Sequence, residues 1–487
     1  MLERIMIFAF LLMLSACTIG PDYHRPSVPT PDAWRYEEAQ AKDTVNTLWW
    51  EQFEDPTLNE LIHIALKENK DVKIAAARVE EFMGQYAAIR AGLFPQVAGS
   101  VSGQRKALTQ YSNPPLSASA DNPYNDFQAL LSASWEIDVW GRLRRATEAA
   151  RADLLASEEG RRGVILTVVT AVAIAYTDLL DFDRQLDIAE RTAKSREHSL
   201  KLFQLRFDRG LVSELELRQV QSEYQSAIAA IPLFQKLIVQ QENALSILIG
   251  RNPGRIARGK PLDELVLPAV PAGLPSQLLE RRPDIRQAEQ NLIAANARIG
   301  VAKALYFPVI SLTGTLGAES TDLSRLFTGP ARIWSYGANA AAPIFTAGGI
   351  AGTVKVAEAV QKQYLLRYQQ AIQQAFREVE DALIDQGKSR EQLQAQGQQV
   401  EVLRRYAYLA RLRYENGHTS YLEVLDAERS LFNAELLYTR TKGELFRALV
   451  NLYKYMGGGW VVEAEKKGGI NGDRNERVSG SADQHGR

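Results

Sequence analysis

The side chains that most often perform chemistry in proteins are few and scattered in this sequence. No two histidines have the spacing that places two metal ligands on one helix face. The five are His24, His63, His198, His418 and His485. The sequence contains no Gly-x-Ser-x-Gly motif and no phosphate-binding glycine loop, and it has a single cysteine. These features argue against an enzyme, and we expect no metal site and no cofactor.

The single cysteine, Cys17, lies in a sequence that predicts a covalent modification. Ten apolar residues follow Arg4, which is the length of a signal-peptide core and too short to span a bilayer. The run ends in Leu-Ser-Ala-Cys, which resembles the lipobox of bacterial lipoproteins. We expect residues 1–16 to be removed and Cys17 to carry lipid, whose buried acyl carbons contribute roughly 0.8 kcal/mol per CH₂. Thr18, rather than Asp, favours passage to the outer membrane.

A short motif containing glycine and glutamate occurs twice, 207 residues apart. Five identities relate residues 205–216 to residues 412–423: Arg206/Arg413, Gly210/Gly417, Ser213/Ser420, Leu215/Leu422 and Glu216/Glu423. Glycine after a helical pattern favours a left-handed helix end. Ser-x-x-Glu is the capping box that begins a new helix. Each copy therefore predicts the tip of a helical hairpin, and the repeat predicts one structural unit built twice.

Long helices must carry these tips. Residues 143–207 contain no strong helix break and have apolar residues spaced three and four apart, which predicts roughly 100 Å of helix. A returning helix is expected over 214–248, with a kink at Pro232, and its counterpart over 422–452. Helices of this length pack against each other as coiled coils.

Four segments alternate apolar and polar residues with the period of a β-strand. They are 97–104, 127–139, 309–318 and 333–345. Each approaches the roughly 9–11 residues that a tilted strand needs to cross a bilayer. Four strands cannot close a membrane barrel, so three chains would have to share 12 strands, or two chains 8. A small soluble sheet packed on helices is the alternative.

The remaining features set the boundaries of the chain's parts. The chain has 487 residues and a net charge of −1, which argues against nucleic acid as a partner. Helical patterns at 58–92 and 276–305 lead into the first strand of each repeat. Five prolines between the repeats predict a linker that does not pack. The expected parts are a signal peptide (1–16), a lipid-anchored N-terminal segment (17–56), repeat 1 (57–250), a linker (251–275), repeat 2 (276–460) and a disordered tail (461–487).

The order of several motifs resembles the TolC-like outer membrane factors, in the branch of efflux-associated outer membrane lipoproteins. The motifs are Cys17–Pro26, Trp49-Trp50 with Phe53 and Asp55-Pro56, Trp135–Arg142 and Glu280–Ile285. The resemblance extends from Cys17 to about Trp460, and only the tail falls outside it.

This resemblance implies a homotrimer with a mixed fold. Long antiparallel helices would form an α-barrel in the periplasm, and four strands per chain would contribute to a shared 12-stranded transmembrane β-barrel. Such proteins are exit ducts of tripartite efflux pumps for drugs or other small toxic solutes. Their partners are a periplasmic adaptor (membrane fusion) protein, an inner-membrane transporter and outer membrane lipid.

The resemblance also assigns roles to the hairpin tips. The periplasmic gate would include Glu423, Asp426 and Glu216, and the adaptor would dock at Gly210, Gly417, Ser213 and Ser420. Glu423 and Asp426 share a helix face, so three copies would surround an axis with carboxylates that attract cations. Glu216 and Glu423 also have a capping role, an alternative that the sequence leaves open. Residues 418–420 hold no basic side chain of the kind that clasps a neighbouring hairpin in some relatives.

Two other functions remain as alternatives. An exit duct for type I protein secretion would share the same architecture. A periplasmic coiled-coil scaffold without a pore would share the helices, although it would not explain the alternating strands.

Overall fold

The computed structural model describes residues 18–36, 48–109, 111, 121–267, 277–458 and 460–461. The predictions for Cys17 and for the tail beyond residue 461 lie outside these residues. The chain forms two compact units. The strand unit comprises the described residues of 1–27, 78–157 and 287–368, and the hairpin unit those of 28–77, 158–286 and 369–487. Each unit takes segments from both sequence repeats.

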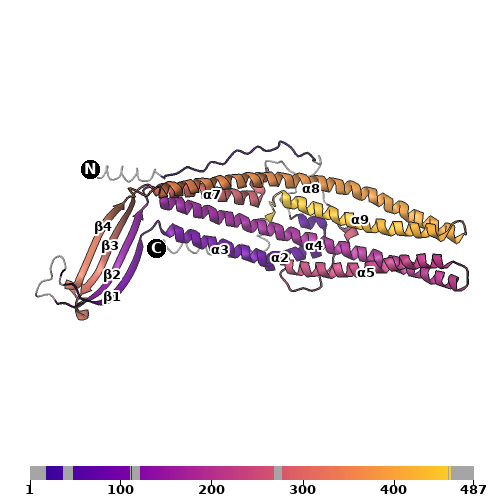
Figure 1. The fold of residues 1–487 in the computed structure, drawn as a ribbon, viewed down its shortest axis with the longest axis horizontal. Helices are drawn as coiled ribbons and strands as arrows, with labels where there is room; N and C mark the ends of the chain where they lie inside the picture. Colours follow the sequence, from indigo (N-terminus) through magenta and orange to yellow (C-terminus); the bar gives the residue numbers. More distant parts are fainter. Residues whose placement is uncertain are drawn as a thin grey trace. The chain divides into compact units, whose positions relative to one another are not determined.

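The elements follow the repeat in the order helix, hairpin of strands, long helix and returning helix (Figure 1). In the first half they are η1 (Trp49–Phe53), α2 (Pro56–Glu68), α3 (Lys70–Ala91), β1 (Gln96–Lys106), β2 (Tyr124–Ile137), α4 (Arg142–Asp208) and α5 (Glu214–Leu248). In the second half they are η2 (Leu262–Glu264), α6 (Leu278–Arg281), α7 (Pro283–Ala304), β3 (Val309–Ser320), η4 (Leu323–Arg325), η5 (Gly329–Ala331), β4 (Arg332–Ala341), α8 (Gly349–Glu415) and α9 (Tyr421–Tyr455).

The four predicted strands are confirmed and form one antiparallel sheet in the order β1-β2-β3-β4. The last strand ends at Ala341, so the predicted extension to residue 345 is wrong. Each repeat contributes one hairpin, and β2 pairs with β3 to join the two. The strands contain 11, 14, 12 and 10 residues, which suffices to cross a bilayer.

The strand register gives the sheet two faces of different character. Residues paired directly across strands share a face; Leu131 pairs with Leu316, which pairs with Trp334. The large apolar side chains of this face are exposed: Val97, Val101, Leu131, Trp135, Leu312, Leu316, Trp334 and Tyr336. The opposite face is mainly polar, as where Ser132 pairs with Thr315 and Thr315 with Ser335. An apolar face left exposed in this way marks a surface that contacts a membrane or another protein.

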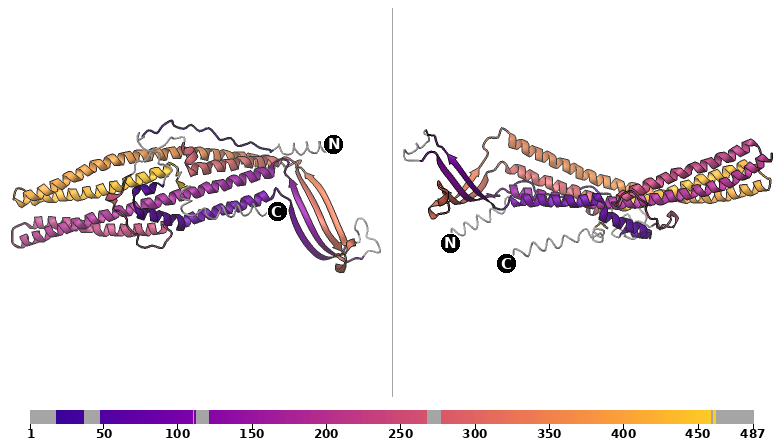
Figure 2. Two further views of the ribbon diagram at one scale, coloured as in Figure 1. Left: turned by 180° about the vertical axis from the view of Figure 1, so that it is seen from behind. Right: turned by 90° about the horizontal axis from the view of Figure 1, so that it is seen from below.

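The long helices are confirmed, and the ribbon turns back on itself between α4 and α5 and between α8 and α9 (Figure 2). Both α4 and α8 contain 67 residues, and α5 runs through Pro232 without a change of element.

The helical pattern over 58–92 is confirmed, and it is divided into α2 and α3 because the chain breaks at Asn69. The Asn69 side chain accepts a hydrogen bond from the Val72 amide at 3.1 Å and donates one to the Leu248 carbonyl at 2.7 Å. It therefore caps α3 while binding the end of α5. The helix expected over 276–305 is likewise divided, with Arg282 between α6 and α7 and Pro283 as the first residue of α7.

The core of the hairpin unit includes a segment that was expected not to pack. Ile256, Leu262 and Leu265, in the described part of the linker, are buried. The Asp55 carboxylate anchors this segment, because it accepts hydrogen bonds from the Tyr176 hydroxyl at 2.8 Å and the Lys260 amide at 3.2 Å. The linker prediction failed because prolines limit regular structure, here to the short helix η2, but do not exclude burial.

Helix α4 contains the most apolar stretch of the described chain. Among the described residues it is the one helix with a window apolar and long enough to cross a membrane, and 67% of that window is buried in the protein. Its residues Ile165, Val169 and Tyr176 belong to the main hydrophobic core. The composition of α4 is therefore accounted for by packing.

A buried carboxylate follows this stretch and makes stability depend on pH. Asp181 is 2% exposed, and its carboxylate accepts a hydrogen bond from the Gln185 amide at 2.9 Å. Burial raises the pKa of Asp181 to about 6, an increase that the Gln185 hydrogen bond partly offsets. A folded-state pKa above the unfolded one means that the contribution of Asp181 to stability is fully present below about pH 4 and is lost as pH rises through about 6.

We predict that Asp181→Asn stabilises the protein at pH 7.5 by about 2–3 kcal/mol and has no effect near pH 4, because the shift of about two pKa units costs about 1.4 kcal/mol per unit. Chemical unfolding of the purified protein in detergent at both pH values measures this. Asp381→Asn, at an exposed ion pair with Arg377, is the control and should show no such difference. Equal stabilisation by Asp181→Asn at both pH values would contradict the burial argument.

Candidate functional site

The two hairpin tips have the backbone geometry that the repeat predicts. Gly210 and Gly417 have φ values of +70° and +74°, in the left-handed region. The Leu211 amide donates to the Arg206 carbonyl at 2.8 Å, and the His418 amide to the Arg413 carbonyl at 2.9 Å. These are the bonds of a Schellman helix end. A side chain at either glycine would meet no atom within 4 Å, so each glycine is required by its conformation and not by lack of space.

The two tips begin their returning helices in different ways. At Ser213 the capping box is confirmed: the Glu216 amide donates to the Ser213 hydroxyl at 3.3 Å, and the Ser213 amide to the Glu216 carboxylate at 2.8 Å. At Ser420 the prediction is wrong, because this serine makes no side-chain cap. The Glu423 carboxylate instead accepts hydrogen bonds from the Thr419 hydroxyl and, at 3.4 Å, from Arg413. These two local donors draw Glu423 away from the cap.

A cluster of aromatic side chains joins the two tips within one chain. The rings of Phe203 on α4 and Tyr421 on α9 lie 4.2 Å apart, and the Tyr414 ring lies 4.9 Å from that of Tyr421. Arg206 donates a hydrogen bond to the Tyr414 hydroxyl at 2.6 Å, and its guanidinium lies 5.7 Å from the Tyr414 ring centroid. Sequence reasoning missed this link, although the Arg206/Arg413 identity marked the position.

The three predicted gate carboxylates each have a partner in their own chain. Glu216 is held by Ser213, and Glu423 by Thr419 and Arg413. Asp426 forms an ion pair with Arg429 at 2.7 Å, and its side chain is 52% exposed. Such an exposed pair contributes at most about 1 kcal/mol. The Asp426 carboxylate is therefore accessible to ions and to other chains.

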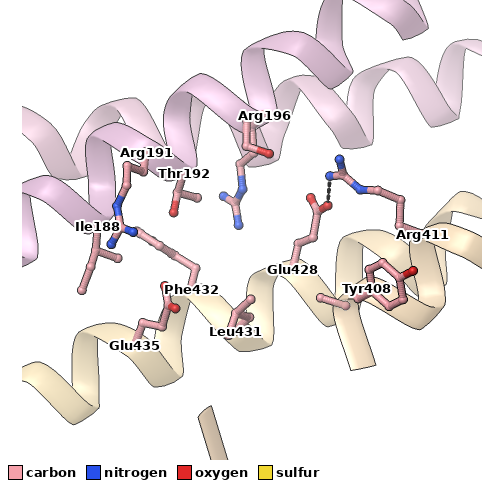
Figure 3. Close-up of a pocket in the computed structure, with 12 residues that line it drawn as sticks. Ile188, Arg191, Thr192, Arg196, Tyr408, Arg411, Glu428, Leu431, Phe432 and Glu435 are labelled. Atoms are coloured by element: carbon pink, nitrogen blue, oxygen red, sulfur yellow. Dashed lines mark hydrogen bonds and ion pairs between the residues drawn. The ribbon is translucent and has the colours of Figure 1, made fainter. Parts of the chain in front are cut away.

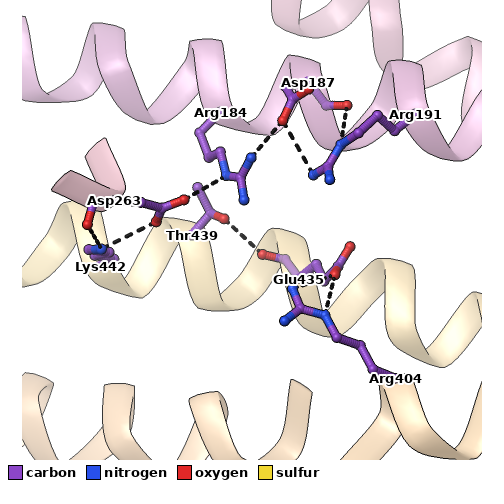
Figure 4. A network of polar contacts seen from close by, with 8 residues as sticks. All are labelled: Arg184, Asp187, Arg191, Asp263, Arg404, Glu435, Thr439 and Lys442. Carbon is purple, nitrogen blue, oxygen red and sulfur yellow. Dashed lines mark hydrogen bonds and ion pairs between the residues drawn. The ribbon is translucent and has the colours of Figure 1, made fainter. Parts of the chain in front are cut away.

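A network of ion pairs stabilises the helices that carry the tips (Figure 4). Arg184 on α4 pairs with Asp187 at 2.6 Å and with Asp263 at 3.0 Å. Lys442 on α9 also pairs with Asp263, at 3.2 Å. Asp263 lies in the segment between the repeats, so this segment holds the two hairpins together within the hairpin unit.

The N-terminal segment is tied to the strand unit immediately after the predicted lipidation site. The Ile19 amide donates to the Trp140 carbonyl at 3.0 Å, and Asn296 donates to the Pro21 carbonyl at 2.8 Å. Gly20, with a φ of +110°, lies so close to Gly300 that a Cβ on it would come within 2.4 Å of the Gly300 Cα. This contact holds residues 19–21 beside the junction of β2 and α4.

Three aromatic side chains, Trp135, Trp334 and Tyr336, lie on neighbouring rungs of the apolar sheet face, because Tyr336 is level with Ala133 and Trp334 with Leu131. Trp135 lies towards the end of β2 that leads to α4, and its indole donates to the Leu93 carbonyl at 3.0 Å. Trp334 and Tyr336, near the start of β4, stack with ring centroids 5.8 Å apart. Within the described residues, no three His, Cys, Asp or Glu side chains gather as metal ligands.

A family model described as outer membrane efflux protein matches residues 61–251 and 274–458, once in each half of the chain. Among curated proteins, the solvent efflux pump outer membrane protein SrpC of Pseudomonas putida is 37% identical over 460 residues, covering 93% of this chain and 97% of SrpC. The cation efflux system protein CusC of Escherichia coli O6:H1 is 36% identical over 468 residues, covering 94% of this chain and 99% of CusC.

Solved structures have the same fold. The CmeC outer membrane channel of Campylobacter jejuni superimposes with a TM-score of 0.87 at 26% identity, covering 94% of this chain and all of that chain. The open state of the MtrE outer membrane channel of Neisseria gonorrhoeae gives a TM-score of 0.83 at 32% identity, covering 91% of this chain and 99% of that chain.

We predict that Tyr414→Phe loosens both tips, because it removes the hydrogen bond from Arg206. A hydrogen bond to a charged group contributes about 1.5 kcal/mol, so amides in 205–217 should exchange with deuterium roughly tenfold faster. Hydrogen exchange with mass spectrometry measures this. The control is Tyr408→Phe, at an exposed ring on the same helix. Unchanged exchange at both turns would show that the aromatic packing alone holds the tips.

Proposed function

Because the chain belongs to the outer membrane efflux protein family, we propose that three copies of it assemble into the exit duct of a tripartite pump. The protein is an efflux channel of the outer membrane, in a family of transport channels rather than enzymes. The finer points of the proposal are the trimer, the partners, the lipid anchor and the gate.

The observation that supports a trimer most strongly is that the sheet has two open edges. Among the described residues, β1 pairs only with β2, and β4 only with β3. In lipid, each unpaired backbone group costs several kcal/mol, so the edges must pair with other copies. Two copies would give 8 strands, whose interior is just wide enough for side chains to fill it. Three copies give 12 strands and leave a lumen, as an efflux channel requires.

The two faces of the sheet support the same arrangement. The exposed apolar face, which includes Val101, Leu316 and Tyr336, would contact lipid. The face that carries Ser132, Thr315 and Ser335 would line an aqueous lumen. This alternation of apolar and polar faces is that of a membrane barrel.

The hairpin tips are the proposed site of the gate and of docking. Three copies of Asp426 would surround the duct with exposed carboxylates, whose negative potential attracts cations. A periplasmic adaptor would contact the turns at Gly210 and Gly417, whose open surroundings leave room for a partner. The adaptor would connect the duct to an inner-membrane transporter, which supplies the energy.

The proposed lipid anchor fits the position of the N-terminal segment. Thr18, the residue after Cys17, lies against Gly141, where a Cβ on the glycine would come within 2.8 Å of the Thr18 methyl group. Gly141 follows β2, a strand that the proposal places in the membrane. Acyl chains on Cys17 would therefore enter the same bilayer as the barrel.

Small organic toxic solutes are the proposed cargo. The relatives SrpC, at 37% identity, and the toluene efflux pump outer membrane protein TtgI, at 37%, are named for solvent and toluene efflux. A passive duct selects little by itself, so its pump would set the choice of solute.

Reversal potentials in planar bilayers test the proposed channel and gate. We predict that Asp426→Ala lowers the ratio of K⁺ to Cl⁻ permeability, by up to about fivefold, because a unit charge about 4 Å from an ion contributes about 1 kcal/mol in water. Arg429→Ala should raise the ratio, because it removes the cation paired with Asp426.

The control variants are Lys388→Ala and Glu391→Ala, which break an exposed ion pair of the same spacing on α8. Unchanged selectivity in both tip variants would remove Asp426 from the gate. A protein that never conducts in a bilayer would contradict the duct itself.

A further inference from the structure

A hollow with a cavity volume of about 360 Å³ lies between α4, α8 and α9 in the hairpin unit (Figure 3). Its wall combines apolar side chains with arginines and glutamates. The apolar part includes Ile188, Leu431 and Phe432. The volume falls in the range of small-molecule pockets.

Arg196 on α4 is the distinctive residue of this hollow. Its side chain is 4% exposed and extends from α4 towards α9 (Figure 3). One guanidinium nitrogen, Nη1, binds Glu223, with the carbonyl at 2.6 Å and the carboxylate at 3.1 Å. The guanidinium carbon lies 5.3 Å from the centroid of the Phe432 ring. The other nitrogen, Nη2, is buried and has no hydrogen-bond partner among the described residues.

A buried donor that lacks an acceptor destabilises the folded protein, and the cost in free energy is larger when the donor belongs to a charged group. Burial lowers the pKa of Arg196, the direction expected of a cation that is incompletely compensated. A ligand that supplied an oxygen acceptor to Nη2 would remove this cost.

The other charged side chains of the wall already have partners. Glu428 pairs with Arg411, and Glu435 pairs with Arg404 at 2.8 Å. Arg191 pairs with Asp187 at 3.3 Å. The unsatisfied hydrogen-bonding capacity of the wall is therefore at Arg196 Nη2, next to an aromatic and aliphatic surface, and a ligand oxygen reaches this buried nitrogen when the side chains that cover it move aside.

We propose that this hollow binds a small organic anion, a carboxylate carried on a compact apolar body such as an aromatic ring. The carboxylate would accept a hydrogen bond from Arg196 Nη2, and the ring would contact Phe432 and Leu431. Arginine is well suited to carboxylates because its donors lie in a fixed plane. Inorganic phosphate would leave the apolar wall uncovered, and a neutral ring would leave Nη2 unpaired. None of the three gate carboxylates lines the hollow, although Glu428 of its wall lies two residues from Asp426, and occupation of the hollow can be measured without transport.

The bound anion would also affect the hairpins. Because the hollow is formed by α4 of the first hairpin and by α8 and α9 of the second, a ligand in contact with all three would stabilise the packing of the two hairpins. The molecules that enter the duct and the metabolites of the periplasm are two sources of such anions, which share this chemistry.

Titration calorimetry of benzoate into the full-length protein in detergent tests the proposal. We expect saturable binding to the wild type, at least tenfold weaker binding to Arg196→Met, and tenfold or more weaker binding to Thr192→Leu, which fills the hollow without altering charge. Arg218→Met is the matched control, because Arg218 is an exposed arginine paired with Glu214 on α5. It should bind benzoate as the wild type does.

Two further ligands distinguish the contribution of the ring from that of the charge. Benzyl alcohol, which has the ring without the charge, and phosphate, which has the charge without the ring, should each bind at least tenfold more weakly than benzoate. Absence of saturable benzoate binding to the wild type would overturn the proposal. Binding of benzoate to Arg196→Met and Thr192→Leu with the affinity of the wild type would also overturn it. Competition between benzoate and an exported solute in the same titration would identify cargo as the source; its absence would identify a regulatory anion.

Discussion

The constraint on which the whole account depends is the pairing of backbone groups at the edges of a four-stranded sheet. In water, open edges can bind solvent, but the exposed apolar face of this sheet calls for lipid, where no solvent is available. The edges must then pair with other copies of the chain. The number of copies follows from the width of the lumen, since 8 strands would be filled by side chains and 12 leave a passage.

The helical part meets a different constraint, because its charged groups must be compensated within the chain. The tips rely on local partners: a Schellman turn at each glycine, one true capping box, and the link from Arg206 to Tyr414. The segment between the repeats adds Asp263, which binds both hairpins. Two buried groups with incomplete compensation lie on α4, Asp181 just before Arg184 and Arg196 between Arg184 and the tip. Protonation of Asp181, or pairing of Arg196 with an acceptor, would stabilise the packing of the hairpins.

Much of the architecture could be predicted from the sequence because it depends on patterns among residues that are close together in the chain. Alternation of period two predicted all four strands, and the repeated Gly and Ser-x-x-Glu motif predicted both tips, because turn and strand signals extend over a few residues. What could not be predicted depends on distant residues. The break at Asn69 involves the carbonyl of Leu248, and the segment that buries Ile256, Leu262 and Leu265 is anchored by Asp55. Glu423 binds Arg413 instead of capping its helix, which depends on residues ten positions apart. The lack of a partner for Arg196 Nη2 depends on how α9 packs against α4.

The stoichiometry of the protein in its membrane tests the central claim most directly. Native mass spectrometry of the protein extracted in detergent would measure it, together with the mass added to each chain at Cys17. The account predicts a trimer with a lipid-sized addition on every chain. A stable monomer or dimer would contradict it, because a monomer leaves the sheet edges unpaired and a dimer closes a barrel without a lumen.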